Sequence, residues 1–129
     1  MKQNDIFDLV GVPILGIFPC GSRITCSPPI LDTDEDWIIR VDDFSIKKVD
    51  DHLVEQGFRL GGSILHNLTP ESQKFWSYTK QGLNHLIVYD IEFFNKFNLA
   101  TKVCKRLNLR KKVDRICLFQ AILYRIVLY

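Results

Sequence analysis

The sequence lacks any long apolar run. No stretch reaches the ~20 consecutive hydrophobic residues that a membrane-spanning helix needs, so we expect no membrane partner. The longest uncharged stretch near the N-terminus, residues 9–20, contains Pro13 and Pro19 and follows acidic residues instead of a basic segment. It does not have the pattern of a signal peptide, and we therefore expect a cytoplasmic protein.

Cysteine and histidine are few, and they follow no metal-binding spacing. The chain has 4 cysteines and 3 histidines, with no Cys-x-x-Cys pair. This excludes a recognisable zinc motif and favours reduced, at least partly buried thiols. Hydrophobic residues make up 47% of the chain, which indicates a folded protein. The length of 129 residues predicts one domain, residues 1–129, with one core.

Charge is distributed unevenly, although the net charge is only +2. Residues 1–55 contain 11 acidic and 5 basic side chains, whereas residues 56–129 contain 4 acidic and 12 basic ones. The basic half suits the phosphates of a nucleotide or a nucleic acid. The alternative is that both halves carry ordinary solvated faces.

Two short polar motifs lie beside predicted strands in the acidic half. An apolar segment, residues 14–18, leads to Gly21-Ser22, and Asp34-x-Asp36 begins the strand-like sequence DEDWIIRV. Residues i and i+2 of a strand point to the same face, so Asp34 and Asp36 present two carboxylates side by side. A hard divalent cation removes the repulsion between such carboxylates. Glycine lets the backbone approach a phosphate closely, and the serine hydroxyl can bind phosphate oxygens.

This combination resembles the signature of the nucleotidyltransferase fold, the DNA polymerase beta-like superfamily. In that signature a strand ends in Gly-Ser and, after a short spacer, Asp-x-Asp opens the next strand. Gly21, Ser22, Asp34 and Asp36 match it, and Thr33 precedes the acids as in the family's Ser/Thr-Asp-x-Asp. The resemblance implies that Asp34 and Asp36 bind Mg²⁺ or Mn²⁺ and that Gly21 and Ser22 bind a nucleotide.

The activity that this resemblance implies is metal-dependent transfer of a nucleoside monophosphate from a nucleoside triphosphate to a hydroxyl acceptor. The acceptor is RNA, a protein or a small molecule. Further segments resemble a small phage and bacterial branch of the superfamily, so the resemblance covers most of the chain. These segments are residues 57–63, 82–109 and 112–124.

A third carboxylate usually joins the Asp-x-Asp pair in active members of the superfamily. Its position falls most naturally at Asn84, and an amide cannot act as a base. By alternation Asp90 lies on the same face as Asn84, so we include it with Asp34 and Asp36 as a candidate catalytic residue. Asp90 also precedes a predicted helix, where a role as N-cap is the alternative. Without a third acid, the chain is a catalytically degenerate protein that binds a nucleotide or a partner.

Several basic residues are candidates for phosphate binding. Arg23 follows the Gly-Ser pair, and Lys80 and Arg59 are further candidates. A basic run in the C-terminal half can bind an acidic acceptor such as RNA, although such runs are more often the solvated sides of helices. The run comprises Lys102, Lys105, Arg106, Arg110, Lys111, Lys112 and Arg115.

Periodicity and turn residues predict an α/β (α+β) fold, a nucleotidyltransferase-like mixed sheet flanked by helices, with two C-terminal helices. The sheet is expected to be mainly antiparallel. Gly57 is expected to end a helix, and Asn108 is expected to end another. The predicted strands lie near residues 14–20, 36–42, 74–79 and 83–89, and the predicted helices near 45–56, 91–107 and from about 112.

Overall fold

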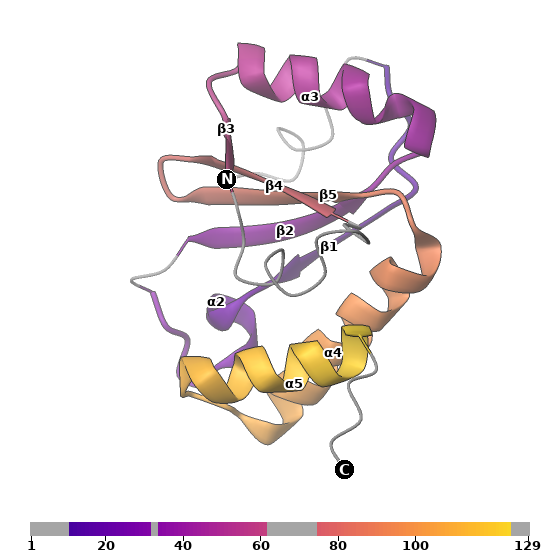
Figure 1. Ribbon diagram of the computed structural model, residues 1–129. Coiled ribbons are helices and arrows are strands. Elements are labelled where there is room, and N and C mark those ends of the chain that lie inside the picture. Colours follow the sequence, from indigo (N-terminus) through magenta and orange to yellow (C-terminus); the bar gives the residue numbers. More distant parts are fainter. Residues whose placement is uncertain (1–10, 32–33, 62–74, 125–129) are drawn as a thin grey trace.

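The computed structural model describes residues 11–31, 34–61 and 75–124 (Figure 1). Within these ranges, five strands form one mixed sheet in the order β1-β2-β5-β4-β3. Strands β2 and β5 run parallel, and the other neighbouring pairs run antiparallel. The predicted α/β class with a mainly antiparallel sheet is confirmed. The strands are β1 (Gly16–Cys20), β2 (Glu35–Arg40), β3 (Arg59–Gly61), β4 (Phe75–Lys80) and β5 (Leu83–Val88).

Helices lie on both sides of this sheet (Figure 1). Helix α3 (Ile46–Glu55), preceded by the 3-10 turn η1 (Asp43–Ser45), lies on one side, and α4 (Ile91–Leu107) and α5 (Lys112–Tyr124) lie on the other. The short α2 (Ser22–Thr25) follows Gly21 directly and is not among the predicted helices. In the described part of the chain, no helix combines the length and the apolar character needed to cross a membrane.

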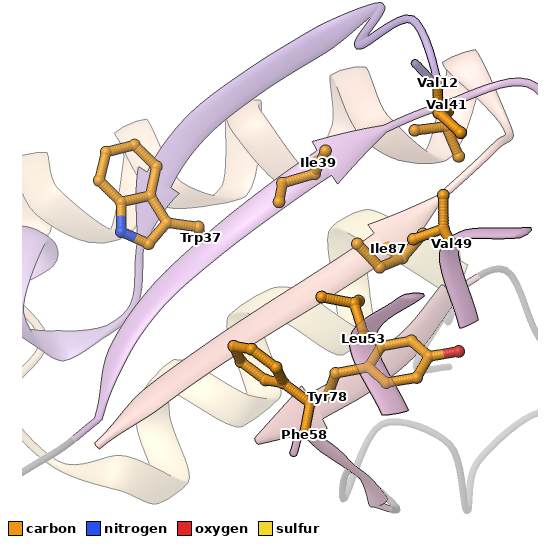
Figure 2. Close-up of a cluster of buried hydrophobic side chains, with 9 residues drawn as sticks. All are labelled: Val12, Trp37, Ile39, Val41, Val49, Leu53, Phe58, Tyr78 and Ile87. Carbon is orange, nitrogen blue, oxygen red and sulfur yellow. The ribbon is translucent and has the colours of Figure 1, made fainter. Parts of the chain in front are cut away.

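Alternation along the central strands divides the core into two layers. Because both faces of β2 and β5 are covered, the buried run Trp37-Ile38-Ile39 continues without polar interruption. The α3 side buries the cluster shown in Figure 2, which comprises Val12, Trp37, Ile39, Val41, Val49, Leu53, Phe58, Tyr78 and Ile87. The opposite side buries Cys20, Ile38, Phe75, Leu86, Val88, Phe93, Phe97 and Leu123.

A two-residue turn fixes the register of the β4–β5 hairpin. Gln81 and Gly82 both have positive φ values, 41° and 83°, which suit the tight turns that join twisted antiparallel strands. Lys80 therefore pairs with Leu83, and Asn84 pairs with Thr79. Helix α4 ends as predicted, because Asn108 adopts a left-handed conformation with φ 50°.

Candidate active site

The ends of three strands bring the two polar motifs together. Cys20, the last residue of β1, pairs with Asp36 near the start of β2. Asp36 also pairs with Asn84 near the start of β5. Because Gly21 follows Cys20 directly, the Gly-Ser and Asp-x-Asp motifs lie next to each other, as the sequence predicts.

Gly21 is in direct contact with the Asp36 carboxylate. A Cβ atom at Gly21 would collide with Oδ2 of Asp36. Gly21 also has φ 83° and ψ 178°, a backbone conformation that is essentially restricted to glycine. The site therefore requires glycine at this position for two independent reasons, side-chain space and backbone geometry.

A chain of hydrogen bonds holds the Asp36 side chain. Ser77 Oγ donates to Asn84 Oδ1 at 2.7 Å, and Asn84 Nδ2 donates to Asp36 Oδ1 at 2.9 Å. An ionised carboxylate accepts only, so the Asn84 amide must turn its nitrogen toward Asp36. Asn84 thus occupies the place beside Asp36 where the sequence predicts a third acid, and its oxygen points to Ser77.

Asp36 has a raised pKa. Burial is the main cause and the neighbouring Asp34 adds to it, while the hydrogen bond from Asn84 and the charge of Arg23 act in the opposite direction; together they raise the pKa of Asp36 from 3.8 to about 6. The carboxylate is half-buried, whereas Asp34 is exposed. A cation placed against both carboxylates would offset the unfavourable burial and repulsion.

These residues open onto a cavity between the sheet and the C-terminal helices. Its volume is about 370 Å³, which lies within the range of small-molecule sites. Polar residues line one part of it and aromatic and aliphatic residues line the rest. The lining residues are Cys20, Gly21, Ser22, Thr25, Asp34, Asp36, Phe75, Asn84, Leu86, Phe97, Lys112, Arg115, Ile116 and Phe119.

Helix α5 supplies the positive side of this cavity. Lys112 and Arg115 line it, whereas Lys102 and Lys105 of the same basic run are exposed on α4. Arg115 Nη1 donates to the carbonyl oxygens of Leu109 at 3.1 Å and Arg110 at 2.6 Å, which fixes the guanidinium at the start of α5. The structure therefore divides the basic run into cavity-lining and solvated members.

Three predicted site residues lie away from the cavity lining. Asp90 caps α4, where its side chain accepts a hydrogen bond from the Phe93 backbone at 3.0 Å. It is six residues beyond Asn84, about 20 Å along an extended chain, so the structure does not bring it to Asp36. Lys80 Nζ donates to the Gln56 carbonyl at 2.6 Å, beside the end of α3.

The third of these residues is Arg23, and the further candidate Arg59 is also remote. Arg23 Nη2 donates to the Leu31 carbonyl at 3.2 Å, and its charge lowers the pKa of Asp36 without the side chain lining the cavity. Arg59 is exposed on β3, at the edge of the sheet. Thr33 of the Ser/Thr-Asp-x-Asp motif lies outside the described residues.

The carboxylates of Asp34 and Asp36 suit a cation that binds together with a substrate. No group of three or more His, Cys, Asp and Glu side chains is arranged to hold a metal ion in residues 11–31, 34–61 and 75–124. Mg²⁺ is commonly held by one or two carboxylates, and waters and substrate phosphates complete its shell. Asp34 and Asp36 provide such a pair at the edge of the cavity.

Sequence reasoning missed Ser77 and the apolar part of the cavity. Ser77 is polar in a strand rich in aromatic residues, and the Gln81–Gly82 turn places it on the same face as Asn84. Hairpin register is thus the signal from which this neighbour of the site could be found. Phe119 and Ile116 carry no such signal, because α5 is apolar on more than one side.

Comparison with known proteins adds no relative: no family model, no curated protein and no solved structure matches this chain.

Proposed function

We propose that this protein is a nucleotidyltransferase. It binds a nucleoside triphosphate with Mg²⁺ or Mn²⁺ in the cavity. A hydroxyl group of an RNA, a protein or a small molecule attacks the α-phosphorus, the bond to the β-phosphate breaks, and pyrophosphate and the hydroxyl proton are released. The observation that carries this proposal is the direct contact of Asp36 with Gly21, in a cavity of about 370 Å³ that Asp34 and Ser22 also line. It unites the carboxylate pair and the Gly-Ser turn in one site.

Each side chain has a defined task in this proposal. Asp34 and Asp36 hold the cation, and Asn84 and Ser77 fix the direction of the Asp36 carboxylate. A cation held there would neutralise phosphate charge and favour the ionised form of the attacking hydroxyl. Gly21 makes room for the Asp36 carboxylate, the Ser22 hydroxyl binds phosphate oxygens, and the walls of the cavity exclude water from the nucleotide.

A second candidate function is nucleotide binding without transfer. Asn84 favours it, because its amide nitrogen faces Asp36 and supplies neither a charge nor a base. Asp90 is the acid that could compensate along this strand, and it caps α4 instead. Among the described residues, Asp34 and Asp36 are the carboxylates that line the cavity.

Calorimetry and label transfer separate these possibilities. Wild-type protein is titrated with α,β-methylene ATP and Mg²⁺, and each of the four α-labelled nucleoside triphosphates is incubated with the protein and a bacterial lysate. Asp34→Asn and Asp36→Asn should lower nucleotide affinity and abolish labelling, because each keeps side-chain shape and removes a charge. Asp51→Asn is the control, since this exposed carboxylate pairs with Lys47 on α3. Wild-type affinity in the variant that combines both active-site substitutions would contradict the proposal.

Label transfer by the wild-type protein distinguishes a transferase from a binder, and Asn84→Asp tests whether a third acid increases that transfer. The substitution places a third carboxylate beside Asp36 with little change in volume. Labelling by wild-type protein, increased by Asn84→Asp, would support transfer as the native function. Nucleotide binding without labelling by the wild type would support the second candidate, whether or not the variant acquires activity.

A further inference from the structure

The face of helix α5 that lines the cavity changes in polarity along its length. Lys112, Arg115, Ile116 and Phe119 line it and are spaced i, i+3, i+4 and i+7, so they follow one face of the helix. Seven residues of helix rise about 10 Å. Over that distance the surface changes from cationic to aromatic.

The sheet wall has the same order of polarity. Asp36 and Asn84 pair near the starts of β2 and β5, and Leu86 follows Asn84 on the same face further along β5. The aromatic end of α5 lies over the apolar part of this wall, since Phe119 packs against the cluster that contains Phe75 and Leu86. The cavity therefore has a charged end and an apolar end, defined by both walls.

The start of α5 lies at the charged end. Arg115 Nη1 is 3.7 Å from the Cys26 sulfur, immediately after α2, and α2 itself follows Gly21. In Figure 1 the first turn of α5 lies close to α2. Among the described residues, Lys112 and Arg115 form no ion pair with Asp34 or Asp36. Opposite charges thus face one cavity without neutralising each other directly.

We propose that α5 orients the nucleotide: Lys112 and Arg115 bind its phosphate oxygens across the cavity from Asp34 and Asp36, and Phe119 contacts its base. This inference rests on the nucleotide binding proposed above and adds the direction in which the ligand lies. Lys112 supplies a mobile ammonium group, whereas Arg115 supplies a guanidinium that is already anchored. The triphosphate lies between cation-binding carboxylates and protein cations.

The apolar end of the cavity should discriminate little between the four bases. Its described side chains, Phe75, Leu86, Phe97 and Phe119, offer no hydrogen-bond donor or acceptor to a base edge. Stacking on an aromatic ring tolerates every base. We therefore expect ATP, GTP, CTP and UTP to bind with affinities within about 10-fold of one another.

Two probes separate the two ends of the site. Inorganic tripolyphosphate and α,β-methylene ATP, each with Mg²⁺, are titrated calorimetrically into wild-type protein and each of the variants named below. Lys112→Gln should weaken both probes by about 10-fold or more, because a charge-assisted hydrogen bond is lost. Phe119→Leu should weaken the nucleotide by about 5-fold and leave tripolyphosphate unchanged. Lys105→Gln, an exposed change on α4, should alter neither.

The results distinguish failure of this inference from failure of the proposed function. Nucleotide binding that is lost in Asp36→Asn but unchanged in Lys112→Gln would overturn the orientation and leave the nucleotide site in place. Nucleotide binding by none of the proteins would overturn both. Lys112→Arg should restore most of the affinity of both probes, and a failure to do so in a variant with wild-type thermal stability would also overturn the assignment. Thermal melts of Phe119→Leu identify any loss that comes from unfolding.

Discussion

The two faces of the sheet each bury an ionisable side chain, in different surroundings. On the α3 side, His85 lies beside the Phe58 ring, with 4.8 Å between ring centroids, and neither imidazole nitrogen has a hydrogen-bond partner among the described residues. On the α4–α5 side, Asp36 accepts a hydrogen bond from Asn84 and borders a cavity. Burial favours the neutral form of both groups.

The comparison of His85 with Asp36 indicates which of the two side chains can bind a charged ligand. Burial lowers the pKa of His85 to about 4, against a smaller opposite effect of Glu35, so the imidazole is neutral at pH 7 and packs as a flat ring. Asp36, with a pKa of about 6, is largely ionised at pH 7 in spite of its burial. The ionised Asp36 carboxylate at the cavity can attract a cation, whereas the neutral His85 ring contributes only to packing.

The largest expected loss of unfolding free energy comes from adding a side chain at Gly21, where the Asp36 carboxylate lies. Gly21→Ala should cost roughly 3 kcal/mol or more of unfolding free energy, because it adds both backbone strain and a collision with the carboxylate. Gly82→Ala is the matched control, since Gly82 has the same φ of 83° and an added Cβ atom there would meet nothing within 4 Å. It should cost only about 1–2 kcal/mol. Urea unfolding measures both, and equal losses would contradict the proposed contact.

Removing the Asp36 charge should stabilise the protein at neutral and alkaline pH. The folded-state pKa of about 6 lies above the ordinary value of 3.8, so the destabilising contribution of Asp36 is complete above this window and is lost as pH falls through it. Asp36→Asn should therefore raise the unfolding free energy at pH 8 by at most about 3 kcal/mol and at pH 4 by less than about 1 kcal/mol. Urea unfolding at both values is the measurement. Destabilisation at pH 8 would show that the ionised carboxylate supports the fold.

His85 should give the opposite pH dependence. Its folded-state pKa of about 4 lies below the ordinary value of 6.5, so the unfolded chain takes up the proton first as pH falls. This group should remove up to about 3 kcal/mol of stability between pH 6.5 and 4, a loss absent from His85→Phe. Unfolding curves across that range test the prediction. An unchanged pH slope in the variant would contradict burial as the cause.

The smallest expected effect belongs to Asp90. Asp90→Ala should lower the unfolding free energy by about 1 kcal/mol, because the Phe93 backbone loses its cap. Nucleotide affinity and any label transfer should stay at wild-type values, since Asp90 does not line the cavity and lies beyond the end of β5 opposite to Asn84. If Asp90→Ala loses label transfer and keeps wild-type stability, Asp90 would be a catalytic residue and not only a helix cap.

The order of elements and the meeting of the two motifs could be predicted from the sequence. The apolar segments before Gly21 and after Asp36, the Gln81-Gly82 turn and the helix-ending Asn108 each produce a local signal. These signals locate strands and helices within a few residues. The position of Asn84 near Asp36, by contrast, is an expectation that the resemblance implies.

Other parts of the site depend on contacts between distant segments. Whether Lys112 and Arg115 face solvent or a cavity depends on how α5 packs beneath the sheet, and charge runs are usually solvated. The role of Asp90 depends on distance along β5, which alternation alone does not report. The short α2 after Gly21 has too few residues for a periodic pattern.

The Gln81–Gly82 turn has only two residues. An insertion or deletion in this turn should therefore disturb the site more than most substitutions would. One residue inserted there must form a bulge or move β4 by one position against β5, and a one-position shift turns Ser77 from the cavity face to the α3 face. The Asn84 oxygen would then lose the hydroxyl that donates to it, and the hydrogen bond to Asp36 would be left to hold the amide. During divergence of this protein, we therefore expect insertions and deletions to be excluded from this hairpin, although its exposed turn residues contact no part of the cavity.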